Sequence, residues 1–190
     1  MSYALTLYQG SLEAVAEGIR APKKPTAARL LTAWKGIYAG SPGEDLEATL
    51  HEALGMVAAR MKLPPAMGPL KVEAAIVAMI EATTTKLGPL EHSSSGGEQF
   101  REEFLGETMA EILGAPGFER TMTNRPLFGY RAKDYPSWGF LRQEELAKLA
   151  IPTDATGLVF DPDQRPWLED LLVMLGKARS SGLDLLTVYL

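Results

Sequence analysis

The two ends of this 190-residue chain carry apolar, strand-like segments, which constrain the fold more than any other feature. Near the start, residues 3–8 alternate with a period of two, which predicts a β-strand. The segment from Leu183 to Leu190 has the apolar and β-branched composition of a second strand. Because an apolar strand must be paired, we expect the two end strands to be neighbours in one sheet.

Between these ends, apolar residues recur at helical spacing in several segments. Ser11 can cap a helix over residues 12–20, and Gly182 can end a helix that begins near Pro166. The motif at residues 41–44 has the form of a capping box for a third helix. Further helices are predicted at residues 27–39, 69–87, 98–113 and 142–150, with a small strand at 157–160. The sequence therefore predicts a single, helix-dominated α+β domain over residues 1–190.

Two stretches lack this periodicity. Residues near 88–97 are rich in serine and glycine, and we expect a mobile surface loop there. Residues near 115–141 are predicted to form a long loop in which aromatic residues and prolines accumulate. Irregular segments of this length are uncommon in compact domains and are often functional.

Composition excludes several kinds of site. The chain has no cysteine and only two histidines, so thiolate chemistry is excluded and a zinc site built from several imidazoles is disfavoured. His51-Glu52 begins like a zinc-protease motif, but Gly55 stands where the second histidine is required. Asp161 and Asp163 follow an apolar stretch, and helix capping explains them better than phosphoryl transfer. We expect no catalytic constellation, no metal and no cofactor.

Charge and hydropathy narrow the choice of partners and location. The net charge of −5 disfavours nucleic-acid binding, which needs a basic face to neutralise phosphates. No apolar run is long enough for a signal peptide or a membrane span. The expectation is a cytoplasmic protein without a membrane partner.

One segment departs from this acidic background. Residues 118–142 contain five cationic and two acidic side chains, a net charge of +3, whereas the rest of the chain carries −8. Tyrosine, tryptophan and arginine are the residue types that dominate binding energy at protein interfaces. The candidate binding residues are Arg125, Tyr130, Arg131, Lys133, Tyr135 and Trp138. The competing interpretation is a loop that packs its aromatic rings on the sheet and leaves its arginines in water.

Three segments together resemble a known family. They are residues 3–8 with the helix that follows, residues 135–146, and the ending from Trp167 to Leu186. In these segments the chain is similar to the small bacterial YfbM-like proteins. The resemblance implies an α+β domain whose first and last strands share a small sheet covered by helices, and it implies no catalytic residues. The resemblance also suggests a role as an immunity or accessory protein that accompanies a bacterial toxin.

Two functional hypotheses follow. The favoured one is a cytoplasmic protein-binding module, of the immunity or accessory type, that occludes a protein partner such as a toxin stoichiometrically. The alternative is an enzyme or small-ligand binder for an anionic or nucleotide-like substrate. In that case Arg125, Arg131 and Lys133 would hold phosphate, and Asp134 or Asp161 would act as a base.

Overall fold

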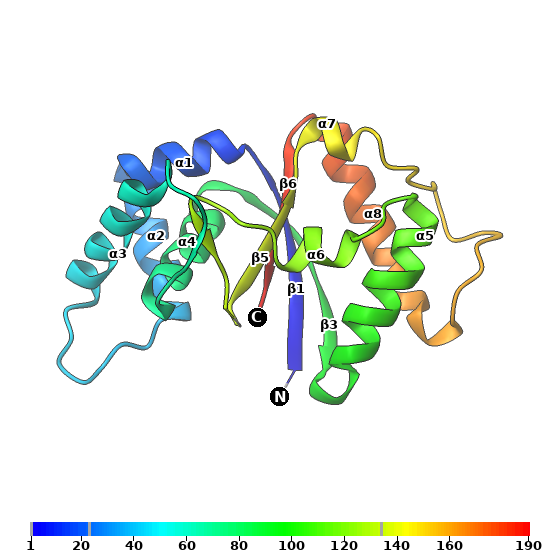
Figure 1. Cartoon of the computed structure of the whole chain (residues 1–190), viewed down its shortest axis with the longest axis horizontal. Helices are drawn as coiled ribbons and strands as arrows, with labels where there is room; N and C mark the ends of the chain where they lie inside the picture. The colour runs from blue at the N-terminus through cyan, green and yellow to red at the C-terminus, as the bar shows by residue number, and fades with distance from the viewer. Residues whose placement is uncertain (1, 23, 134) are drawn as a thin grey trace.

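The computed structural model describes residues 2–22, 24–133 and 135–190. A four-stranded antiparallel sheet with the strand order β3-β1-β6-β5 lies at its centre, and helices cover both faces (Figure 1). Its strands are β1 (Ser2–Gly10), β3 (Thr85–Ser93), β5 (Ser137–Leu141) and β6 (Asp184–Tyr189). Two short strands, β2 (Ala66–Met67) and β4 (Tyr130–Arg131), form a separate parallel pair. The predicted α+β class and the pairing of the first and last strands are confirmed.

Strand β1 serves two hydrophobic cores, because its side chains alternate between the two faces of the sheet. Leu5 and Leu7 lie opposite Tyr189 and Thr187 of β6 and belong to one core. Tyr8 points the other way and belongs to the second core. Both faces of β1 are therefore buried, and its period of two separates the leucine face from the face that carries Thr6 and Tyr8.

The layer of helices on one face consists of α1 (Leu12–Arg20), α2 (Lys24–Ile37), α3 (Leu46–Arg60) and α4 (Leu70–Thr83). Helix α4 is the inner helix of this layer, since every residue from Val72 to Ile80 is buried. A helix that is apolar on all sides is stable only when protein surrounds it. Trp34 of α2 and Trp138 of β5 are the largest side chains of this core.

The layer on the other face is built from the π-helical segment η2 (Gln99–Thr108), α5 (Met109–Leu113), α6 (Phe118–Thr123) and α8 (Arg165–Ser181). The short elements η1 (Ser94–Gly96), α7 (Gln143–Leu146) and η3 (Pro162–Gln164) join them. Phe100 and Phe104 of η2 are fully buried with Leu168 and Leu171 of α8. The sheet therefore lies between two helical layers.

Helix termini follow the sequence signals in two of three cases. The Ser11 hydroxyl accepts from the backbone N–H of Ala14, and Gly182 ends α8 with a φ of 68°. The capping box at residues 41–44 is wrong as a helix start, because the Asp45 carboxylate caps α3 instead. A carboxylate satisfies two free N–H groups there and also favours the positive end of the helix dipole.

The predicted loops differ most from the structure. Residues 85–93 form β3, the partner of β1, so the predicted helix at 69–87 ends at Thr83 and the loop near 88–97 is mostly strand. The segment at 115–141 contains α6, β4 and β5 rather than one long loop. The strand predicted at 157–160 does not form.

Side chains cover both edges of the central sheet. The Trp167 indole N–H donates to the backbone carbonyl of Glu91 on β3, at 2.9 Å. At the other edge, the Arg125 guanidinium donates to the Phe140 carbonyl of β5 at 2.9 Å, and the Arg125 backbone N–H donates to the Trp138 carbonyl at 3.2 Å. Covered edges protect a sheet from pairing with other chains. Within the described ranges, no helix combines the length and the apolarity needed to cross a membrane.

Candidate functional site

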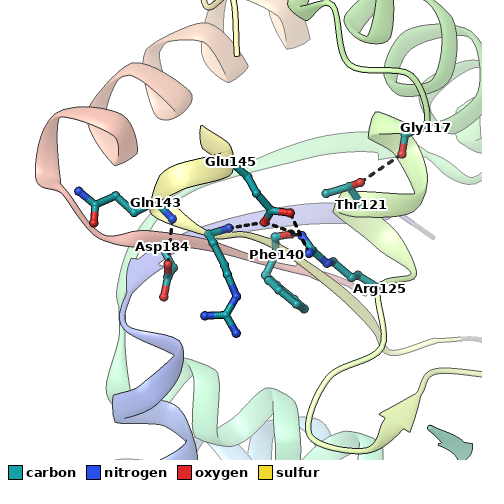
Figure 2. A network of polar contacts seen from close by, with 8 residues as sticks. Gly117, Thr121, Arg125, Phe140, Gln143, Glu145 and Asp184 are labelled. Atoms are coloured by element: carbon teal, nitrogen blue, oxygen red, sulfur yellow. Dashed lines mark hydrogen bonds and ion pairs between the residues drawn. The ribbon is translucent and has the colours of Figure 1, made fainter. Parts of the chain in front are cut away.

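Arg125 clamps the edge strand β5. Its guanidinium donates to both carboxylate oxygens of Glu145, at 2.7 and 2.9 Å, and to the backbone carbonyl of Phe140 at 2.9 Å (Figure 2). The same group lies 4.0 Å from the centre of the Phe140 ring. Hydrogen bonds from Arg125 lower the pKa of the Glu145 carboxyl, and this keeps the pair charged. Because Glu145 already occupies it in bidentate fashion, Arg125 has a structural role rather than the predicted role in binding.

Tyr130 and Trp138 belong to the core. Tyr130 is 6% exposed and Trp138 is fully buried, and both lie in the cluster that contains α4. An anchor for a partner must be accessible before the partner arrives. The structure therefore assigns these two rings to folding, as in the competing interpretation of the segment.

Arg131 and Lys133 lie on a stretch whose side chains alternate between core and solvent. Tyr130 and Ala132 are buried, whereas Arg131 and Lys133 are exposed. The Lys133 backbone N–H donates to the buried carboxylate of Glu73 at 3.0 Å, which fixes the stretch on α4. Neither cationic side chain forms an ion pair with any described residue. These two side chains remain available to a partner.

One exposed apolar side chain lies beside Arg131. Met67 of β2 lies beside Arg131 in the parallel pair and is 53% exposed. Leu63 and Leu70, which flank Met67 in the chain, are 51% and 56% exposed. Exposed apolar residues that gather within a polar rim are typical of interaction surfaces. We give the name basic–apolar face to the Met67–Arg131 pair together with the exposed residues nearby in the chain, Leu63, Leu70 and Lys133.

Tyr135 lies at the other end of β5 from Arg125, in an aromatic cluster. Its ring centre is 5.3 Å from that of Tyr3 and 5.1 Å from that of Tyr189. The Tyr189 hydroxyl donates to Nε2 of His92 at 2.6 Å, and burial raises the pKa of Tyr189. The six candidate residues thus occupy separate places: the β5 clamp, the core, the basic–apolar face and this aromatic cluster.

The sequence analysis missed Leu63, Met67 and Leu70. A signal was present, because residues 63–70 combine apolar side chains with three prolines in a connector between two helices. A helical stripe cannot continue through such a connector, so its apolar residues have no helix face through which to be buried. They are candidates for contact with another molecule.

The other residues considered from the sequence have structural explanations. His51 is exposed on α3 with its Nδ1 atom 2.8 Å from the Glu47 carbonyl, and the Asp161 carboxylate accepts from the Asp163 N–H at the start of η3. Asp134 lies outside the described residues. Among the residues that are described, no three His, Asp or Glu side chains come together in a way that could hold a metal ion.

Comparison with protein-family models, with curated proteins and with solved structures finds no match to this chain. The similarity to the YfbM-like proteins stays an expectation that rests on the terminal segments and on residues 135–146.

Proposed function

We propose that this protein is a binding module that docks an acidic segment of a partner protein on the basic–apolar face. The observation that carries the proposal is the juxtaposition of Arg131, which has no ion-pair partner among the described residues, with the exposed Met67. A cytoplasmic location and an immunity or accessory role, exerted by covering part of the partner, belong to the same proposal.

The chemistry of the face suits an acidic segment that also carries apolar residues. Met67, Leu63 and Leu70 each keep about half of their surface in water, and burying the remainder is worth about 1 kcal/mol per side chain. Arg131 and Lys133 supply positive charge on a protein whose net charge is −5. Rim charges of this kind chiefly raise the rate of association and select the partner's sign of charge.

The small-ligand alternative has less support. It requires Arg125, Arg131 and Lys133 to converge on one phosphate, but Glu145 occupies Arg125 at the edge of β5. Arg131 and Lys133 are exposed, and neither lines the groove of about 450 Å³ next to α1 or the cavity of about 550 Å³ next to α8. Two exposed cations outside these cavities fit a protein surface better than a small ligand, because small-molecule sites are usually concave.

Fluorescence anisotropy with two labelled peptides tests the proposal. We expect a short acidic peptide that contains leucine to bind, and its lysine counterpart not to bind. Binding should weaken as the ionic strength rises from about 0.05 to about 0.5 M, because screening shortens the reach of the surface charges. The double variant R131E/K133E should abolish binding.

The matched control is K177E/R179E, which reverses two exposed cations of α8 and changes the net charge by the same amount. It should bind the acidic peptide as the parent protein does. Equal losses in both double variants would show a response to net charge alone and would refute the assignment to this face. Absence of binding to the parent protein would refute the proposed function.

A further inference from the structure

A groove of about 450 Å³ runs between α1 and the turn at residues 127–130. Its apolar lining includes Leu12, Met61, Phe128 and Phe140. This volume falls in the range of about 300–1,000 Å³ that is usual for binding pockets in proteins. Two aromatic rings and two aliphatic chains therefore border a space large enough for a bulky side chain.

The turn that borders the groove holds Phe128 in an unfavourable conformation. Leu127 and Tyr130 exchange two backbone hydrogen bonds of 2.8 and 2.9 Å, and the residues between them, Phe128 and Gly129, have φ values of 51° and 77°. Such a two-residue turn favours Asn-Gly, because both central residues are left-handed. Gly129 is required, since a Cβ atom there would lie 2.4 Å from the Arg60 carbonyl oxygen. A phenylalanine in the other position costs about 1–2 kcal/mol.

The second ring of the groove is fixed in place by the β5 clamp. The Arg125 guanidinium covers Phe140 at 4.0 Å and also binds its backbone carbonyl, and Glu145 holds the guanidinium in turn (Figure 2). A ring held in this way does not have to be ordered when a ligand binds. Arg125 is thus a positioning residue for the groove.

Charges at the rim of the groove are balanced. Glu13 and Glu17 of α1 lie at the rim with Arg20 and Arg142, and Arg142 forms an ion pair of 3.6 Å with Glu13. Two carboxylates and two guanidinium groups give the rim no net charge. The groove is therefore suited to an uncharged guest, in contrast to the basic–apolar face.

We propose that this groove receives an uncharged aromatic side chain of the protein that docks on the basic–apolar face, an inference that rests on the proposed function. Both sites include residues from the same two pieces of chain, residues 60–67 and 127–131, whose strands β2 and β4 are paired. An acidic segment on the face would place a neighbouring residue of the same partner within reach of the groove. The strained Phe128 provides one wall for that residue.

Paired peptides test the groove separately from the face. An acidic peptide extended at either end by tryptophan should bind at least about tenfold more tightly than the same peptide extended by alanine, as for an interface anchor. The variant F128N should remove this gain and keep a melting temperature close to that of the parent, because the better fit of asparagine to the turn offsets the lost packing of Phe128 against the core. R131E/K133E should weaken both peptides equally. Equal binding of both peptides by the parent would overturn the proposal that the groove receives an aromatic side chain, and would leave the proposal for the basic–apolar face intact.

A second readout does not depend on the face. N-acetyltryptophanamide, an uncharged aromatic probe, should shift the amide resonances of Ala16 and Gly129 in ¹H–¹⁵N NMR spectra, and those of Met67 should stay unchanged. The variant A16W, which fills the groove from α1 and leaves the turn intact, should abolish the shifts, as should F128N. Absence of any shift at Ala16 and Gly129 in the parent protein would overturn the inference even if no acidic peptide binds.

Discussion

Removing the clamp on β5 should destabilise the protein measurably. In R125M the aliphatic stem is kept and the guanidinium is lost. The Arg125 and Glu145 side chains are 29% and 35% exposed, so solvent screens their ion pair and we assign it about 1 kcal/mol. The hydrogen bond to the Phe140 carbonyl adds about 1 kcal/mol and the contact with its ring about 0.5 kcal/mol. The loss of about 2–3 kcal/mol should lower the melting temperature by about 5–10 °C in a domain of this size.

The pH dependence of this loss has a definite sign. Arg125 lowers the pKa of Glu145 in the folded protein, so the pair contributes fully above the carboxyl pKa of the unfolded chain, about 4.3. Its contribution disappears as the pH falls through the lower pKa of the folded state. Urea unfolding followed by circular dichroism should therefore show a constant difference between parent and R125M above about pH 5.5, and a shrinking one below about pH 4. R120M, which removes an exposed arginine of α6, is the control. Equal urea midpoints of unfolding for R125M and R120M at pH 7 would refute the stabilising role of the Arg125 clamp.

Three further predictions test the fold. D45A should lower the free energy of unfolding by about 1 kcal/mol, whereas S41A should change it by less than about 0.3 kcal/mol, because only the aspartate caps α3; urea titrations distinguish the two. W167F should cost about 1 kcal/mol in the same assay and increase hydrogen exchange along β3, since it removes the donor at that edge. G139A should prevent stable folding, because its Cβ atom would lie 2.1 Å from a backbone oxygen of α6, whereas G176A, with open space around it in α8, should raise the melting temperature; thermal scans of both would show the contrast.

Local signals in the sequence predicted the parts of the fold that depend on neighbouring residues. Such signals predicted the helix cap at Ser11, the helix end at Gly182 and the alternation of side chains in β1. Strand β3 was not, because Thr84 and Leu87 continue the helical stripe of α4, and only the pairing of this segment with β1 makes it a strand. A preference set by a partner some eighty residues away overrides local spacing.

The candidate site was predicted only in part, for a related reason. Segment composition predicted binding roles for Arg131 and Lys133, which are exposed in the structure, and for Tyr130 and Trp138, which are buried. Core tyrosines and tryptophans are the same residue types as interface anchors. The difference lies in which face of a strand each residue occupies, and β4 is too short to be recognised from its sequence. Met67 was missed because its relation to Arg131 exists only through the pairing of β2 with β4.

The position of β6 between β1 and β5 has a consequence for how the chain reaches its native state. Strands β1 and β5 are not paired with each other. Strand β5 therefore has no strand neighbour until β6 has been synthesised, and β6 comes after α7 and α8 in the chain. Contacts between residues distant in sequence slow folding. During synthesis, β5 cannot join the sheet that lies between the two helical layers before β6 is available. Until then the edge of β1 that pairs with β6 stays open to chaperones and to other chains. Strands β1 and β3 can pair earlier, but completion of the four-stranded sheet is a late event that depends on a single six-residue strand.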